Sequence, residues 1–161
     1  MKRLILLLPI ILFWANVSNA QESKLYEKYG EMKGITSVYM PLGWLSSTGI
    51  MNQVASEIDD VDLSPIMNKL SLMIVLSSEK EAGVKALSSE RTLVSKDKNY
   101  QLIFQVKEDD EVITGYLKTK DGVNAEEFLL FVSEEDEAVV VQLFGDMTVD
   151  DVKKVAGSVN R

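Results

Sequence analysis

The apolar residues of the chain follow helical spacing in its first half and mostly strand spacing in its second. Near the start, Leu25, Tyr29 and Met32 recur every three to four residues behind Ser23, a favourable helix N-cap, and predict a short helix. Residues 35–40, rich in β-branched and aromatic side chains, predict a strand. The first two predicted elements are therefore a helix and a strand.

Two more helices and a buried strand are predicted before residue 95. Residues 51–58 have apolar side chains at positions i, i+3, i+4 and i+7, the pattern of a helix with one buried face. A single turn follows at 64–65, where a capping serine precedes proline, and the continuous apolar run 70–76 predicts a strand buried on both faces. Ser-Glu-Lys-Glu at 78–81 has the form of a capping box and predicts a helix that runs to about Val94.

From residue 100 onward apolar and polar residues alternate, which predicts antiparallel strands. Leu102, Phe104 and Val106 should share one face of a first hairpin. Residues 128–132 and 139–144 supply a second hairpin. Because a tight Asp-Gly turn joins the two hairpins, the four strands should form a consecutive meander.

The last predicted element is a helix whose start is marked by three local signals. Thr148 is placed to cap it, Asp151 stands at the third helical position of a capping box, and Met147 with Val152 supplies the flanking apolar pair. The predicted order is α-β-α-β-α-β-β-β-β-α. It specifies an α+β fold with helices packed on one antiparallel or mixed sheet that includes a four-strand C-terminal meander.

The first twenty residues have the three parts of an export signal peptide. Lys2 and Arg3 precede the apolar run 4–13, and small residues end the segment at Ala20. We expect cleavage after Ala20, which leaves residues 21–161 as a single globular domain. The apolar run is too short to span a membrane, and the chain has no cysteine to carry a lipid. The mature protein should be periplasmic or secreted, without a lipid anchor or a membrane span.

Charge narrows the class of partner. Loss of residues 1–20 removes two basic residues and no acidic one, so the mature chain has 15 Lys and Arg residues against 25 Asp and Glu residues, a net charge of −10. Nucleic acid and anionic membrane surfaces attract proteins of the opposite sign. We expect an envelope protein or a cationic partner, and no nucleic acid.

The absence of two residue types limits the chemistry. With no His and no Cys, the chain cannot form a Ser-His-Asp or Cys-His nucleophile, a zinc site of His or Cys, or a haem held by His. Carboxylate pairs, a Ser-Lys arrangement or a hard metal held by oxygen ligands remain available. No catalytic residue and no cofactor is predicted.

Three longer segments of the sequence carry a family resemblance. They are EKYGEMKGITSVYM near the predicted mature N-terminus, KLSLMIVLSSEKE in the middle and EEFLLFVSEEDEAVVVQLFGDMT before the last helix. Together they resemble domain-of-unknown-function family 4252, small exported bacterial proteins, over about Leu25 to Val155. The resemblance implies an envelope or secreted domain without established catalytic residues. Because members tend to be encoded near extracytoplasmic sigma-factor genes, it also implies a link to envelope signalling.

Two acidic hairpin tips form the first candidate site. Alternate turns of a meander fall at the same end of the sheet, so the tips 108–111 and 134–137 should project from one edge. The candidate ligands for a cation are Glu108, Asp109, Asp110, Glu134, Glu135 and Asp136. Calcium, which takes about six to eight oxygens, is the metal ion that suits such a surface, and a basic protein patch is the alternative. Charged tips also occur simply because they keep hairpins soluble.

Two large aromatic residues beside a proline form the second candidate site. Tyr39 lies near the end of the predicted strand, and Trp44 follows a Pro-Leu-Gly corner where the chain departs from the family pattern. Together they would form a shallow platform for a partner, whereas a buried Trp44 would make the segment an ordinary corner.

These features favour an exported, non-enzymatic envelope protein that acts as a binding or interaction module, with envelope signalling or stress response as its setting. The alternative is a small exported hydrolase that uses carboxylates with or without a divalent metal. A deep pocket with converging acids would favour the hydrolase, and a flat apolar patch would favour the binding module.

Overall fold

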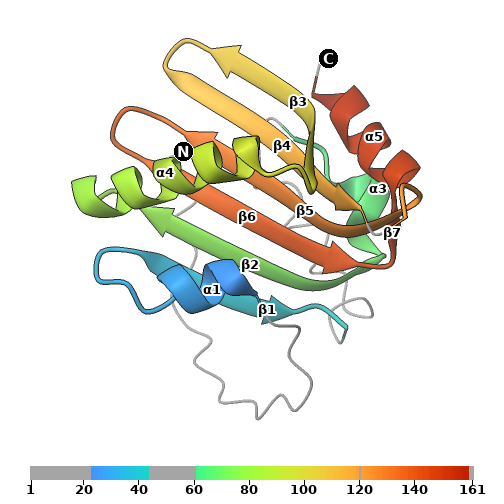
Figure 1. The fold of residues 1–161 in the computed structure, drawn as a ribbon, viewed down its shortest axis with the longest axis horizontal. Helices are drawn as coiled ribbons and strands as arrows, with labels where there is room; N and C mark the ends of the chain where they lie inside the picture. The colour runs from blue at the N-terminus through green and yellow to red at the C-terminus, as the bar shows by residue number, and fades with distance from the viewer. Residues whose placement is uncertain (1–22, 44–60, 120, 160–161) are drawn as a thin grey trace.

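One antiparallel sheet with helices on both faces makes up the fold (Figure 1). The computed structural model describes residues 23–43, 61–119 and 121–159. Its elements, in chain order, are α1 Lys24–Tyr29, β1 Thr36–Pro41, α3 Ser64–Met67, β2 Leu70–Ser78, α4 Glu81–Lys96, β3 Tyr100–Glu108, β4 Glu111–Thr119, β5 Asn124–Ser133, β6 Ala138–Gly145, β7 Met147–Thr148 and α5 Val149–Ser158. The predicted α+β fold is confirmed, and the helix predicted over 51–58 lies outside the described residues.

The strand order explains why the middle of the sheet is apolar throughout. The order is β1-β2-β6-β5-β4-β3, with β7 paired to β5, and every pair is antiparallel. The predicted four-strand meander is confirmed. Its last strand, β6, pairs on its other side with β2, so β2, β6 and β5 lie in the centre with most residues buried on both faces. Among the described strands, β1 and β3 are the two edges.

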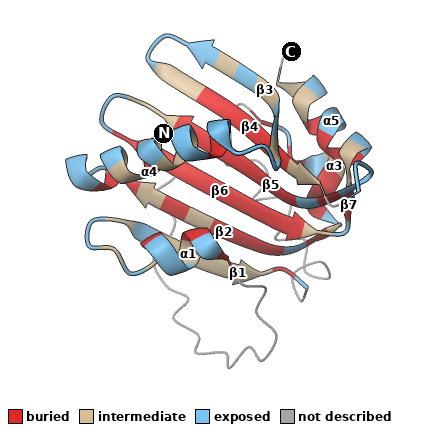
Figure 2. Cartoon of the chain, viewed as in Figure 1, coloured by how far each residue is buried: buried red, intermediate tan, exposed pale blue. Residues whose placement is uncertain are grey.

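Each face of the sheet carries its own apolar core. On the α1/α4 face, Leu87 of α4 belongs to the same buried cluster as Phe131 of β5. On the opposite α3/α5 face, Val152 of α5 belongs to a second cluster with Phe128 of β5. Figure 2 shows the buried residues concentrated in β2, β6, β5 and β4. The sheet is therefore the shared wall of two cores.

Two helices begin as the sequence predicts. The Ser23 Oγ accepts a hydrogen bond from the backbone N–H of Tyr26 at 3.1 Å and caps α1. At α5, the Thr148 Oγ1 accepts from the Asp151 N–H at 3.2 Å, and the Asp151 carboxylate accepts from the Thr148 N–H at 2.9 Å. The predicted capping box is confirmed, and the apolar pair that flanks it is buried.

The helix α4, at 16 residues, is the longest described helix. Leu87 and Val94 point into the core as predicted, while Val84 is half-buried. In the part of the chain that the structure describes, no helix is long and apolar enough to cross a membrane.

The predicted capping box at 78–81 is wrong. Ser78 is the last residue of β2, where it pairs with Ala138, and α4 begins after Lys80 as its N-cap, without a side-chain cap. The Ser78 Oγ instead donates to the Gly34 carbonyl at 2.7 Å and accepts from the Lys80 N–H at 3.0 Å. Strand pairing therefore keeps the backbone of Ser78 in β2, and the hydrogen bond to Gly34 keeps its hydroxyl from capping α4.

The single turn predicted at 64–65 is a short helix, but its N-cap is one residue earlier than expected. Leu63 occupies the N-cap position without a side-chain hydrogen bond, and Ser64 is the first helical residue. The Ser64 N–H donates to the Asp62 carboxylate at 2.9 Å. A carboxylate two residues upstream thus does what was expected of the serine hydroxyl.

The first hairpin departs from simple alternation. Leu102 and Phe104 were expected on one face, but the register shifts between them and leaves Leu102 52% exposed. Phe104 instead lies over Gly115, where a Cβ atom would come within 2.6 Å of the ring, and meets Phe128 edge-on with 6.4 Å between ring centroids. The bulge therefore serves to pack the half-buried Phe104 against the core.

Candidate functional site

The two acidic hairpin tips lie at the same end of the sheet. Val112 pairs with Ser133, so the β3–β4 turn and the β5–β6 turn are neighbours (Figure 1). We call residues 108–111 and 134–137 the acidic end. At the β3–β4 turn, Asp109 adopts a positive φ of 48°, a conformation that Asp tolerates better than most residues. The six candidate cation ligands are thus brought to one end by strand register alone.

The exposure of the tips is uneven. Glu108, Asp109 and Asp110 are exposed on one tip, and Glu135 and Asp136 on the other, while Glu134 is half-buried. Within the described ranges, no group of three or more Asp, Glu, His or Cys residues is arranged to hold a metal ion. The tip carboxylates are therefore neighbours without forming a chelating set, and a calcium site stays a prediction.

Glu137 differs from the rest of the acidic end because it is buried. It is 6% exposed, and its Oε1 atom has no hydrogen-bond partner in the described structure. The turn around it is closed by the backbone, since the Glu134 N–H donates to the Glu137 carbonyl at 2.8 Å. Burial, followed by the nearby carboxylates of Glu134 and Glu79, raises the pKa of Glu137.

The aromatic candidate site is described only in part. Tyr39 lies in β1 opposite Ile74, half-buried, with its ring 5.2 Å from the ring of Tyr26 at a tilt of 59°. Burial raises the pKa of Tyr39. Trp44 lies outside the described residues. The described member of the pair thus packs against α1, on the α1/α4 face.

A buried line of polar side chains crosses the α1/α4 face of the sheet. The Ser23 hydroxyl donates to the Gln142 Oε1, the Gln142 Nε2 donates to the Glu127 Oε1 at 2.6 Å, and the Tyr100 hydroxyl donates to the Glu127 Oε2 at 3.0 Å. Burial raises the pKa of Glu127, which the hydrogen bonds from its two neutral partners oppose. Burial beside Glu127 raises the pKa of Tyr100. The line ties α1 and the start of β3 to the centre of the sheet.

The sequence analysis missed this line, although alternation contains the signal. The predicted strand began at Phe128, but β5 begins at Asn124 and so includes Glu127. Counting back by two from Phe131 and Leu129, which face α1 and α4, places Glu127 on the same face. A charged residue on that face needs partners, and Gln142, the one polar residue in the run 138–144, is the obvious candidate.

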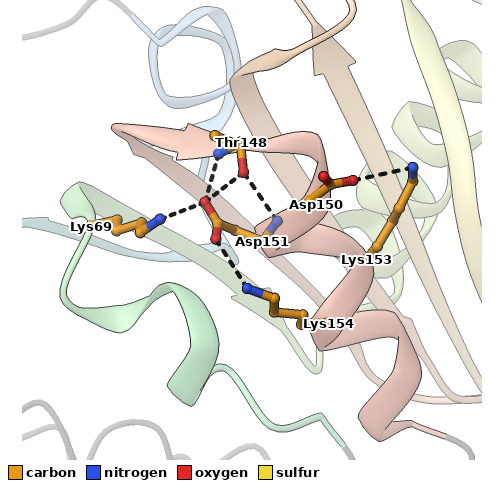
Figure 3. Close-up of polar contacts among 6 residues, drawn as sticks. All are labelled: Lys69, Thr148, Asp150, Asp151, Lys153 and Lys154. Atoms are coloured by element: carbon orange, nitrogen blue, oxygen red, sulfur yellow. Dashed lines mark hydrogen bonds and ion pairs between the residues drawn. The ribbon is translucent and has the colours of Figure 1, made fainter.

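A second buried carboxylate joins α5 to the start of β2 (Figure 3). The Lys69 ammonium and the Thr148 hydroxyl each donate to the Asp151 Oδ2 at 2.7 Å, and Lys154 forms an ion pair with the other oxygen at 3.8 Å. The hydrogen bonds from Lys69 and Thr148 hold the pKa of Asp151 far below its usual range. Both oxygens are occupied, so this cluster is structural and offers no free ligand.

Comparison with known protein families identifies one family whose model matches this chain. The family model described as Domain of unknown function (DUF4252) matches residues 26–155. The chain belongs to this family. The matched range, which confirms the resemblance seen in the sequence, begins in α1 and ends in α5. It includes the acidic end and, except for Ser23, the buried polar line of this DUF4252 protein. No curated protein and no solved structure matched the chain.

Proposed function

We propose that this DUF4252 protein is an exported, non-enzymatic binding module of the cell envelope that holds a cationic partner at its acidic end. Envelope signalling or stress response is the setting that the family resemblance suggests. The observation that carries the proposal is the pairing of Val112 with Ser133, which puts two acidic turns next to each other. Charge that is spread along the sequence becomes concentrated at one end of the molecule.

The charge of residues 108–110 in the β3–β4 turn has little compensation from within the described chain. No ion pair joins Glu108, Asp109 or Asp110 to a Lys or Arg of the described residues, whereas acidic residues elsewhere, such as Glu90 and Asp151, have such partners. Uncompensated like charges create a local potential that attracts and orients a partner of opposite sign. A surface of this kind supports recognition of a basic patch.

Binding also fits the chemistry of the described carboxylates better than hydrolysis does. A hydrolase needs an acid whose proton can reach a substrate. Glu127 has a raised pKa, but both of its oxygens accept hydrogen bonds from Gln142 and Tyr100 inside the protein. The exposed carboxylates of the acidic end have room for a partner and suit a role as charged contacts.

The first test is the binding of a labelled hexalysine peptide to mature protein, residues 21–161, by fluorescence anisotropy. We expect binding that weakens by about tenfold or more between about 20 and 300 mM salt, because exposed charges are screened over this range. Replacement of Glu108, Asp109 and Asp110 by Gln, Asn and Asn should weaken binding by a similar factor.

A matched control removes three charges elsewhere. Glu27, Glu31 and Asp146 are exposed and lie in α1, the loop after it, and the turn after β6. Their replacement by Gln, Gln and Asn makes the net charge less negative by the same amount and should leave peptide binding nearly unchanged. Equal losses in both triple variants would mean that net charge alone attracts the peptide, and the proposal would be wrong. Capture of partners from envelope extract, with the same two variants, then identifies the natural ligand.

A further inference from the structure

Glu137 occupies a position where three strands end together. It immediately precedes Ala138, which pairs with Ser78 of β2 on one side and with Ser133 of β5 on the other. Its backbone closes the β5–β6 turn through the bond from the Glu134 N–H. The backbone of Glu137 is thus fixed at the base of the acidic end, where the strands meet the turn.

Its carboxylate is treated differently from the two other buried carboxylates of the described chain. Glu127 accepts hydrogen bonds from two neutral donors, and Asp151 accepts from an ammonium, a hydroxyl and a backbone N–H. The Glu137 Oε1 is as deeply buried and has no partner in the described structure. Buried acceptors without partners are rare in native proteins because desolvation without a hydrogen bond is unfavourable. The atom therefore points to a donor that comes from outside.

The surroundings of Glu137 select a positively charged donor. After burial, the largest causes of its raised pKa are the carboxylates of Glu134 and Glu79, so these two described neighbours add negative potential around Glu137. No ion pair joins Glu137 to a Lys or Arg of the described residues. A cation that entered here would meet one buried carboxylate and the negative rim of the acidic end above it.

The geometry suits an organic cation better than a metal ion. Calcium requires several converging oxygens, and no group of three acidic residues in the described ranges is arranged to hold a metal. An ammonium or guanidinium group needs only one carboxylate for a strong charge-assisted hydrogen bond. We infer that Glu137 is the anchor of the acidic end and that its free oxygen receives a single Lys or Arg side chain of the partner. This inference rests on the proposed function and names the contact that gives it specificity.

The test compares Glu137→Gln with Glu135→Gln in the mature protein, using hexalysine and hexaarginine peptides as probes. Both variants lose one charge from the same turn, but Glu135 is exposed. Because removal of a buried charge partner at an interface weakens binding strongly, we expect Glu137→Gln to raise the Kd by about thirtyfold or more. Glu135→Gln should change it by less than about threefold.

A second measurement does not depend on the variants. The side-chain carboxyl carbon of Glu137, observed by NMR in the wild-type protein, should shift on peptide addition and report a lower pKa in the complex. Without peptide, the Glu137→Gln variant should unfold at the same or a higher temperature than wild type, because the substitution removes an unpaired buried charge.

The possible failures are distinguishable. If both single variants weaken binding equally and the Glu137 carboxyl signal stays unchanged, the anchor is wrong while the proposed function stands. If neither peptide binds the wild-type protein, the proposed function and the anchor fall together. If calcium chloride alone shifts the Glu137 signal and displaces the peptides, the residue is part of a metal site and the inference is overturned.

Discussion

Buried carboxyl groups of this protein have different surroundings, and their pKa values move accordingly. The hydrogen bonds of Asp151 to Lys69 and Thr148 lower its pKa, so its ionised form stabilises the fold. Glu127 has neutral partners and Glu137 has none for one of its oxygens, and burial raises the pKa of both. Ionisation of these two residues therefore opposes folding. Within one molecule, an ionised carboxylate stabilises the fold at Asp151 and destabilises it at Glu127 and Glu137.

The substitution Glu127→Gln tests this at one residue. A carboxyl whose pKa is raised in the folded protein destabilises the fold least at a pH below its ordinary pKa. The free energy of unfolding then falls as the pH rises toward the pKa of the folded state. Wild type should thus lose stability through this group as the pH rises above the ordinary carboxyl value of about 4. Glu127→Gln keeps the shape and one acceptor without the charge, so its free energy of unfolding should depend less on pH.

Urea unfolding at about pH 4 and at about pH 8, on either side of neutrality, provides the measurement. Glu126→Gln, the exposed neighbour that pairs with Lys118 at 3.4 Å, is the control and should keep the wild-type pH dependence. Glu127→Leu leaves the Gln142 and Tyr100 donors unsatisfied and should lower the free energy of unfolding by about 1–3 kcal/mol at each pH. An unaltered pH slope in Glu127→Gln would show that this carboxyl is not the cause.

At the scale of elements, the capping-box motif predicts a helix start correctly at one position and wrongly at another. The capping box predicted at 148–151 is present, and the one predicted at 78–81 is absent. Both have a hydroxyl followed by an acid three residues later. The difference is that the backbone of Ser78 pairs with Ala138 in the sheet. Its hydroxyl donates a hydrogen bond to the Gly34 carbonyl, 44 residues away in sequence. Local signals predict an element start only where no distant strand competes for the same side chain.

The same distinction explains how much of the fold and the site was predictable. Period and turn signals suffice for the meander, the helix order and the shared end of the two acidic turns, because these follow from neighbours in sequence. Strand order beyond the meander, the bulge that exposes Leu102 and the partners of Glu127 depend on contacts between distant residues. The unpaired oxygen of Glu137 belongs to this second group, since nothing in its sequence distinguishes it from Glu134 or Glu135.

The start of α5 gives a prediction at the element scale. Thr148→Ala removes the cap and should lower the free energy of unfolding by about 1 kcal/mol. Because the pKa of Asp151 is depressed in the fold, its stabilisation is present above the ordinary carboxyl range and is lost as the pH falls below about 4. Asp151→Asn should therefore be less stable than wild type at neutral pH, with a difference that shrinks on acidification.

Asp150→Asn is the matched control for this element, measured by urea unfolding at the same pH values. Asp150 lies in the same first turn but is exposed, and its ion pair with Lys153 at 3.4 Å is solvated. Such pairs contribute little, so the control should remain close to wild type at all pH values. If the Asp150 and Asp151 variants behaved alike, the helix dipole rather than the cap and Lys69 would account for the effect.

The whole molecule places a large share of its negative charge at one end, and this arrangement has a stability consequence. Like charges held close together repel, and folding brings the turns at 108–111 and 134–137 next to each other. Salt screens repulsion between exposed charges. We therefore expect the triple variant Glu108→Gln, Asp109→Asn, Asp110→Asn to have a higher urea midpoint than wild type at low salt, with the difference lost at about 0.5 M salt.

The control triple variant at Glu27, Glu31 and Asp146 separates local from global charge. These residues are exposed and lie outside the two acidic turns, so their removal should change the midpoint less at low salt. If the triple variant at 108–110 gains more in urea midpoint than the control and also loses peptide binding, the charges that bind the peptide are the ones that lower stability. Surfaces selected for function commonly show this trade-off, whereas charges that serve only solubility have no reason to concentrate where they repel. Equal gains from both variants would instead indicate that net charge alone is relieved.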